Sequence, residues 1–478
     1  MSDAQSIVKN ASIVVISEIA SRAISFVLII ILAKFFGDAG LGKYSFIFAF
    51  VGIFSILSDF GISGLMTREV ARDKTKTEKY IANVLGFKIV LCIITILLPS
   101  SIIFFTDESF EIKAGVLLAG FSQAFYYLSY PFRNVFNAYE RQFYHAMYSL
   151  VERIVAFVLG VAALYLGYGL LGFIIVLVFS NLVSLIYSYA VTLKKFSRVA
   201  IEFDIKFLKE TVKGSLPFWF TTLFITIYFK IDTVMLGFMK GFEPTGWYNA
   251  SYKIIDALSL IPLSIGMVLF PVMSRYYKER EKYLQILYVK VVYYLFILAL
   301  PIAVGIAMTS QRIILFVYGN SFENSAASLQ ILVWALLFIF VNYIIGSLLN
   351  SIDKQILFTY TTGFCAILNV GLNFLLIPKY SYIGAAIATV LTELVNFIVL
   401  FSLISKEGYN LPRLAQLLKP VLASFLMGIL LLYTKEYHLF IIVPLSAAFY
   451  FGIMFLIKGV GKEEINLARL LLKNDKNQ

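Results

Sequence analysis

Charged residues, cysteine and histidine are all scarce in this chain of 478 residues. Only 14% of the residues are charged and 60% are hydrophobic, whereas soluble domains carry about 25% charged residues. So little charge excludes a soluble enzyme and a disordered scaffold, because both need a hydrated surface. Uncharged apolar runs of about twenty residues predict helices that cross a membrane, and runs of that length exclude an outer-membrane barrel.

The two cysteines and two histidines predict no site chemistry. Cys92 and Cys365 fall inside apolar runs, so no disulfide framework is expected. His145 and His438 have no partner at a metal-binding spacing, so we expect no metal and no other cofactor. The net charge of +12 does not indicate nucleic acid as a partner, because the basic residues lie mostly in short loops between apolar runs.

Fourteen apolar runs predict an all-α polytopic membrane protein. The first run is too long for a signal-peptide core and has no small-residue cleavage site after it, so we expect it to be retained. The expected spans are 8–34, 43–67, 80–104, 114–136, 144–166, 169–193, 215–239, 246–273, 284–308, 326–350, 355–378, 380–405, 412–433 and 437–458.

Basic residues are distributed unevenly between the two sides of these spans. With a cytoplasmic N-terminus, the cytoplasmic loops and termini hold 26 of the 40 Lys and Arg, and Arg133 is counted there. The opposite side holds seven: Lys34, Lys43, Lys113, Lys240, Arg312, Lys379 and Lys435. The positive-inside rule therefore predicts a multi-pass protein of the cytoplasmic (plasma) membrane with both termini in the cytoplasm.

A polar connector at 194–214 divides the chain into six, six and two spans. Its apolar residues interleave with charges, which favours a segment lying on the membrane surface, with a plain linker as the alternative. We expect an N-terminal lobe at 1–193, a second lobe at 215–405, and two additional helices with a cytoplasmic tail at 406–478. The stretch EEINLARLLLK in that tail is open to the same two interpretations.

The two lobes begin alike. Phe36-Gly37 precedes Gly42-Lys43-Tyr44 between the first two spans, and Lys240-Gly241 precedes Gly246-Trp247-Tyr248 between the seventh and eighth. Parallel repeats of this kind are typical of transporters, whose substrate site lies between the repeats.

Charged side chains inside the spans point to a water-filled cavity, because each costs a few kcal/mol or more when it faces lipid. Seven bases and six acids lie in the spans, and ten of these side chains are candidate site residues. The candidate substrate-binding cations are Arg22, Lys88, Lys230, Lys253 and Lys290; the candidate cavity acids, available for ion coupling, are Glu18, Asp59, Asp232, Asp256 and Glu393.

Each candidate also has a structural interpretation. Glu18 and Arg22 are spaced i,i+4, so they either neutralise one another or line a cavity, and Lys253 with Asp256 presents the same choice. Lys290 is shallow enough for its ammonium to reach the interface. Lys230 and Asp232, two residues apart, cannot pair simply on a helix.

Three long stretches and a short one carry a resemblance over nearly the whole chain. Together they resemble the polysaccharide-transport (O-antigen translocase, Wzx-type) flippases of the multidrug/oligosaccharidyl-lipid/polysaccharide exporter superfamily. The stretches are ILAKFFGDAGLGKYSFIFAFVGIFSILSDFGISGLMTREVAR at 31–72, KIDTVMLGFMKGFEPTGWYNASYKIIDALSLIPLSIGMVLFPVMSR at 230–275, ILFVYGNSF at 314–322 and DKQILFTYTTGFCAILNVGLNFLLIPKYSYIGAAIATVLTEL at 353–394.

The resemblance implies two six-helix lobes around a central cavity, plus two C-terminal helices. It also implies translocation of a polyprenyl-diphosphate-linked oligosaccharide from the cytoplasmic to the outer leaflet, with coupling to H+ or Na+ as an open question. The cations that match the family's cavity are Arg22, Lys88 and Lys230. Membrane lipids and polysaccharide assembly proteins are the partners such a function implies.

Three other functions compete with this one. A drug or cation antiporter of the same superfamily would favour a cavity dominated by carboxylates, whereas bases here slightly outnumber acids. A flippase for a lipid-linked peptidoglycan precursor would differ only in the headgroup. A membrane glycosyltransferase, polymerase or ligase would need a large outer loop or paired carboxylates, and neither is present, so we expect no enzymatic activity.

Overall fold

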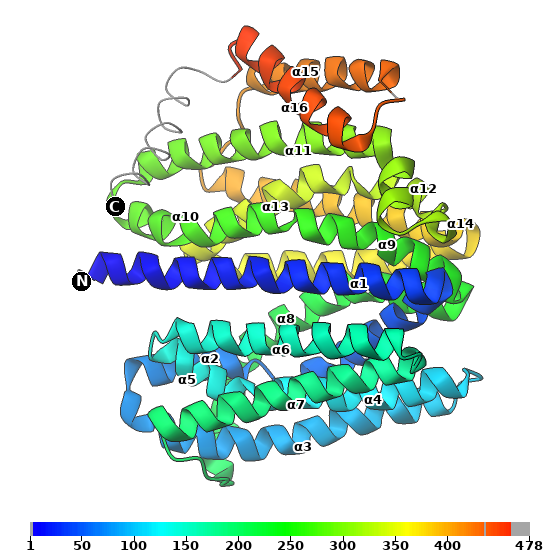
Figure 1. Cartoon of the computed structure of the whole chain (residues 1–478). Coiled ribbons are helices and arrows are strands. Elements are labelled where there is room, and N and C mark those ends of the chain that lie inside the picture. Colours follow the sequence, from blue (N-terminus) through cyan, green and yellow to red (C-terminus); the bar gives the residue numbers. More distant parts are fainter. Residues whose placement is uncertain (1–2, 435, 460–478) are drawn as a thin grey trace. The chain divides into compact units, whose positions relative to one another are not determined.

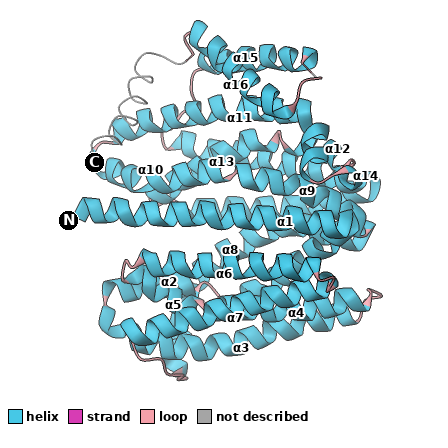
Figure 2. Ribbon diagram, in the orientation of Figure 1, coloured by secondary structure: helices cyan, strands magenta, loops and turns pink. Residues whose placement is uncertain are grey.

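The computed structural model describes residues 3–434 and 436–459, with side chains from Ser17 onward. These residues form helices, short turns and loops, and no strand occurs among them (Figure 2). The predicted all-α class is therefore confirmed. The tail stretch EEINLARLLLK lies outside the described residues.

Sixteen α-helices follow one another along this part of the chain. They are α1 (Asp3–Ser55), α2 (Ile62–Arg72), α3 (Thr77–Phe104), α4 (Phe110–Leu128), α5 (Tyr130–Ala138), α6 (Gln142–Tyr165), α7 (Gly169–Lys195), α8 (Ile205–Lys240), α9 (Phe242–Leu258), α10 (Leu260–Glu279), α11 (Glu281–Val317), α12 (Ser325–Leu332), α13 (Ala335–Ser351), α14 (Gln355–Lys406), α15 (Leu414–Tyr433) and α16 (Leu439–Leu456). Short 3-10 turns lie at Ile56–Ser58, Lys74–Lys76 and Asn320–Phe322.

Ten stretches of the described chain are long and apolar enough to cross a membrane, or eleven when the bent pair α12–α13 is taken as one span. Two of the ten contain a kink and are far longer than one crossing needs. α1 has 53 residues and α14 has 52, about 80 Å of helix each, against a hydrocarbon core of about 30 Å. When the segments on either side of each kink are counted separately and the α12–α13 pair and α4 are added, the total agrees with the fourteen spans predicted.

The kinks occur where the backbone enters the left-handed region. Gly37 divides α1 at φ 68°, and Gly241 ends α8 at φ 82°. Glycine adopts this conformation without steric cost. Both glycines belong to the repeated sequence pattern, so the pattern marks two equivalent turns. Ser381 makes the corresponding break in α14 at φ 53°.

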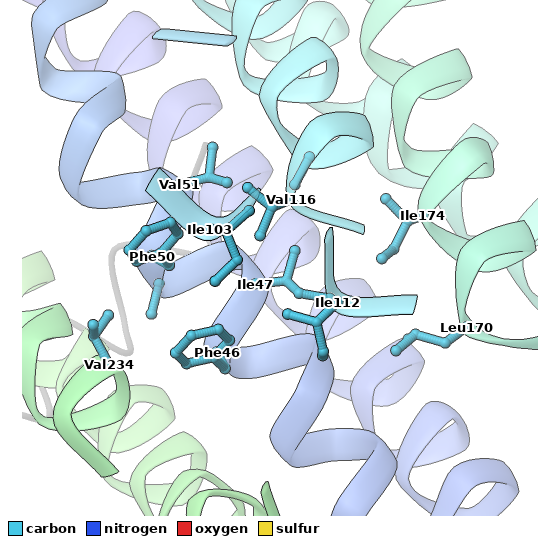
Figure 3. Close-up of a cluster of buried hydrophobic side chains, with 12 residues drawn as sticks. Phe46, Ile47, Phe50, Val51, Ile103, Ile112, Val116, Leu170, Ile174 and Val234 are labelled. Atoms are coloured by element: carbon cyan, nitrogen blue, oxygen red, sulfur yellow. The ribbon is translucent and has the colours of Figure 1, made fainter. Parts of the chain in front are cut away.

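The chain forms two compact units, each described by itself. The first comprises residues 1–257, 318–322 and 359–388. In it α1 packs on α4, α6 and α8, and α7 packs on α4 and α6 (Figure 1). Phe46, Phe50 and Val234 meet in a buried cluster where α1 faces α8, with Ile112 of α4 alongside (Figure 3).

The second unit comprises residues 258–317, 323–358 and 389–478. Within it α11 packs on α12, α13 and α15, and α10 packs on α13. Ile297 of α11, Met427 of α15 and Tyr450 of α16 share a buried cluster, and the Tyr450 hydroxyl donates a hydrogen bond to the Ile297 carbonyl. The two C-terminal helices are thus attached to α11. The division into lobes at 1–193 and 215–405 stays a prediction.

Candidate functional site

Three helices of the first unit bring five of the predicted charged residues together. Arg22 on α1 places its Nε 2.9 Å from Glu18 Oε1, one turn earlier, and its Nη1 4.0 Å from Asp256 Oδ1 on α9. The three side chains stay 38%, 45% and 49% exposed. Lys230 and Lys253 complete what we call the charged cluster. The predicted Glu18–Arg22 pairing is present, and it leaves the guanidinium accessible.

Lys230 reaches the charged cluster through space that a glycine provides. A Cβ on Gly52 of α1 would stand 2.8 Å from Lys230 Cε and 3.1 Å from its Nζ, so the lysine lies against bare backbone. Lys253 and Asp256 are close enough to act electrostatically on the Lys230 ammonium. Three bases against two acids leave the cluster with a surplus of one positive charge.

Lys88 on α3 lies apart from the charged cluster and is fully buried. Its Nζ is 2.5 Å from Asp59 Oδ1 and donates a hydrogen bond of 3.1 Å to the Ser58 carbonyl. The rings of Tyr130 and Tyr127 lie 5.1 and 5.8 Å from the ammonium. These contacts satisfy Lys88 inside the protein, which is the arrangement expected of an anchor between helices.

Asp232 on α8 is the centre of a buried polar cluster. It is 3% exposed and accepts hydrogen bonds from the Tyr248 hydroxyl, at 2.6 Å, and from the Asn373 amide. The Asn373 amide also donates to Asn369 Oδ1 at 2.9 Å. The buried Asn373 Oδ1 has no hydrogen-bond partner among the described residues. A carboxylate of α8 and two amide oxygens from the part of α14 before Ser381 therefore lie close together.

Such oxygen ligands suit a hard, small cation. Across the described residues no group of three or more His, Cys, Asp and Glu side chains could hold a metal ion. In a cation site here, Asp232 would supply the charge and neutral oxygens the remaining ligands. This composition fits a singly charged ion better than a divalent one. The neutral members of the cluster escaped the sequence analysis because a search for charges does not find them.

Glu393 and Lys290 belong to the second unit. Glu393 on α14 is 4% exposed, and its Oε2 accepts a hydrogen bond of 2.8 Å from Asn342 on α13. Lys290 on α11 is exposed. Of the five predicted substrate-binding cations, the structure thus brings together Arg22, Lys230 and Lys253.

The sequence analysis counted Arg133 with a cytoplasmic loop, whereas the structure places it in a helix. Arg133 lies within α5, with its guanidinium 4.9 Å from the Tyr130 ring and 4.4 Å from the Tyr148 ring. Its Nη2 lies 3.4 Å from His145 Nε2. The local signal was the tyrosine-rich run YYLSYPFR at 126–133, which supplies aromatic faces for a cation.

The two repeated turns meet one another in the first unit. Trp247 Nε1 donates a hydrogen bond of 2.7 Å to Asp38 Oδ2. The backbones cross so closely that a Cβ on Gly42 would overlap the Phe242 carbonyl, and one on Gly246 would overlap the Asp38 carbonyl. The glycines of the repeat therefore hold the turn at 37–42 against the turn at 241–246.

Curated relatives and solved structures resemble this chain over different lengths. A membrane protein of unassigned function from Methanocaldococcus jannaschii is 27% identical over 54% of this chain, and the match spans 53% of that protein. The probable low-salt glycan biosynthesis flippase Agl15 of Haloferax volcanii is 23% identical over 80% of each chain. The structure of the lipid II flippase MurJ in an inward closed conformation superposes with a TM-score of 0.77 at 18% identity, covering 92% of this chain and 98% of that one.

A transporter of the MOP superfamily from Pyrococcus furiosus has the same fold, with a TM-score of 0.58 at 16% identity and coverage of 85% and 96%. The MatE family profile matches residues 217–375. The family profile described as Polysaccharide biosynthesis protein matches residues 7–277, which is more than half of the chain. The chain belongs to this polysaccharide biosynthesis protein family.

Proposed function

We propose that this protein is a flippase that moves a polyprenyl-diphosphate-linked oligosaccharide from the cytoplasmic to the outer leaflet of the plasma membrane. The observation that carries the proposal is the charged cluster, in which Arg22, Lys230 and Lys253 lie on membrane-spanning helices with a surplus of positive charge. The family and the flippases among its relatives support the same class of substrate. The protein carries its substrate without changing it chemically.

The physical need for such a cluster comes from the diphosphate. Its charges cannot enter hydrocarbon without partners, and guanidinium and ammonium groups replace lost water by charge-assisted hydrogen bonds. Glu18 and Asp256 orient Arg22 without burying it, so substrate oxygens can take over its N–H groups. The lipid tail stays in the bilayer while the headgroup crosses.

Alternating access requires that one end of the path close while the other opens. The contact between the turns at 37–42 and 241–246 would close the outer end, since the predicted topology places both turns there. Release to the outer leaflet then requires that the Asp38–Trp247 hydrogen bond break.

We propose that the buried polar cluster around Asp232 couples transport to an ion. Asp232 with the amide oxygens of Asn369 and Asn373 would hold Na+, which supplies a positive charge that alters the packing of α8 against α14. Asp232→Asn should abolish any dependence of translocation on a sodium gradient. Undiminished sodium dependence in that variant would reject the coupling role.

Proteoliposomes test the transport proposal directly. Arg22→Gln and Lys230→Gln should slow translocation of a polyprenyl-diphosphate oligosaccharide several-fold while the thermal stability of each protein stays near that of the wild type. Arg72→Gln is the matched control, because Arg72 is a 68% exposed arginine that pairs with Glu69, three residues earlier. Wild-type rates in stable Arg22 and Lys230 variants would refute the proposal.

The same vesicles separate the competing functions. A lipid-linked peptidoglycan precursor and an organic cation serve as alternative substrates. Faster transport of the peptidoglycan precursor would reassign the headgroup, and exchange of the organic cation for protons would reassign the protein as an antiporter. Three bases against two acids favour an anionic substrate over a cationic drug.

A further inference from the structure

The segment between α7 and α8 lies directly on α3. We call residues 197–205 the strap. The strap is not helical before Ile205, yet its backbone is held at two points: Glu202 N–H donates to the Ala82 carbonyl at 3.2 Å, and Asp204 N–H donates to Asn83 Oδ1 at 2.6 Å. The strap therefore follows the first turns of α3.

Gly86 permits this close approach. A Cβ at Gly86 would stand 2.8 Å from the Glu202 carbonyl oxygen and 3.1 Å from Phe203 Cζ. A larger residue at this position would lift the strap from α3. Both ends of the strap are anchored in the same unit, by Phe196 against Tyr139 and by Phe207 against Tyr80.

Three apolar side chains of the strap are largely exposed. Ile201, Phe203 and Ile205 are 58%, 57% and 79% exposed. Ile201 and Phe203 touch α3 at Gly86 with one edge of each side chain, and more than half of each stays exposed. The Glu202 carboxylate is 3.5 Å from the Asn83 amide and Asp204 pairs with Lys79 at 3.2 Å.

The position of the strap along the axis of α3 indicates what covers Ile201, Phe203 and Ile205. The 28 residues of α3 make about 42 Å of helix, some 12 Å more than the hydrocarbon core, or about 6 Å at each end. Ala82 and Gly86 lie about 8 and 14 Å from the first residue of α3. The strap thus lies at the edge of the hydrocarbon core.

Positive charge is in surplus around the strap. Residues 194–214 contain six bases and three acids, and one of those acids, Asp204, is paired with Lys79 of α3. The bases Arg198, Lys206 and Lys209 are exposed. A surface that combines apolar side chains with a surplus of exposed positive charge is complementary to anionic lipid headgroups.

We infer that the strap is a binding surface for anionic lipid in the cytoplasmic leaflet. Ile201, Phe203 and Ile205 enter the boundary between headgroups and acyl chains, and the exposed bases contact the lipid phosphates. The inference rests on the strap's own geometry and on the membrane spans, and it does not depend on what the protein transports. Failure of the transport proposal would therefore leave it intact.

Fluorescence quenching tests the apolar half of this inference. A small fluorophore on Phe203→Cys, in nanodiscs of anionic phospholipid, should be quenched by lipids that carry a spin label near the glycerol and protected from aqueous iodide. Thr75→Cys, on the exposed turn before α3, is the matched control and should show the reverse. The native Cys92 and Cys365 are buried and give little background labelling. Equal iodide quenching at both positions would overturn the inference.

The charged half is tested separately. The triple variant Arg198→Gln, Lys206→Gln, Lys209→Gln should lose several-fold of the enrichment of anionic over zwitterionic lipid around the purified protein. Arg72→Gln, Lys76→Gln, Arg141→Gln removes three other exposed bases of the same unit and should retain that enrichment. Equal retention in both triples would overturn the anionic-lipid assignment. Iodide protection of Phe203→Cys in native membranes but not in nanodiscs would show that a protein covers the strap, and would overturn it too.

Discussion

Lys88 and Arg22 show how differently two intramembrane cations of one unit are used. Lys88 is fully buried and bonded to Asp59 and Ser58, whereas Arg22 is held by two carboxylates at a site that stays partly exposed. A buried ammonium that is already bonded to a carboxylate and a backbone carbonyl has little to offer a substrate. An accessible guanidinium can exchange its partners.

The Lys88–Asp59 pair should therefore matter for stability. Lys88→Gln leaves the mostly buried Asp59 carboxylate without its cation and should cost about 3–5 kcal/mol, measured as thermal or denaturant stability in detergent. The double variant Lys88→Met, Asp59→Leu should recover part of that loss, because neither charge is then buried alone. Full stability of Lys88→Gln combined with lost translocation would return Lys88 to the substrate site.

Contacts between residues of one helix could be predicted from their spacing in the sequence, whereas contacts between helices could not. The Glu18–Arg22 pair follows from its i,i+4 spacing and is present. Asp59 and Lys88 are 29 residues apart, and no periodicity specifies which helices will face one another. Asn373 joins Asp232 across 141 residues and carries no charge that would single it out.

Asp204 lies near the end of the strap and caps the N-terminus of α8. Its carboxylate accepts the Phe207 N–H at 3.0 Å and pairs with Lys79. The hydrogen bond from the Phe207 backbone, aided by Lys79, lowers the pKa of Asp204. A lowered carboxyl pKa stabilises the folded state above the unfolded-state pKa, and that contribution is lost as pH falls through the folded value.

Asp204→Ala should thus lower the melting temperature at neutral pH, because the helix loses its cap. The difference from the wild type should shrink on acidification, as the wild-type carboxylate becomes protonated and loses the same interactions. Melting curves of both proteins across the acid range measure this. A difference that stays constant down to the lowest pH would show that Asp204 acts without its charge.

The close contact between the two repeated turns should make Gly246 sensitive to substitution. Gly246→Ala places a methyl group against the Asp38 backbone, which cannot move aside cheaply, and overpacking of this kind costs about 1–3 kcal/mol. We expect a lower melting temperature and greater reactivity of a cysteine introduced at Asp38.

Gly371→Ala is the matched control, because Gly371 lies within α14 and a Cβ there would meet no atom within 4 Å. It should leave both measurements near the wild-type values. Equal effects of the two variants would contradict the close crossing. The repeat itself could be recognised in the sequence. The contact between its two copies could not be predicted, because similarity between two segments does not imply that they touch.

At the scale of the whole chain, the length of the apolar runs was the feature that predicted the fold reliably. Apolar runs are local and each must match the bilayer, so the all-α class and the number of spans could be predicted. The breaks at Gly37 and Ser381 fall where the predicted spans end. Arg133 shows the limit of the method: a charge near a predicted boundary was counted with a loop, whereas tyrosine rings hold it inside α5.

Orientation in the membrane is the prediction that every functional statement above depends on. The excess of Lys and Arg on one side predicts that both termini and the strap are cytoplasmic. In intact cells a membrane-impermeant maleimide should label Asp107→Cys, in the exposed loop after α3, and leave Ala200→Cys unlabelled. Permeabilising the cells should then expose Ala200→Cys.

The two positions control for one another, since α3 separates the loop at Asp107 from the turn at Lys74–Lys76 near the strap. Cys92 and Cys365 are buried in the native fold, so the wild-type protein reports the background. Labelling of Ala200→Cys in intact cells, with Asp107→Cys protected, would invert the topology. The turns at 37–42 and 241–246 would then close the cytoplasmic end, and the proposed direction of transport would have to be reversed.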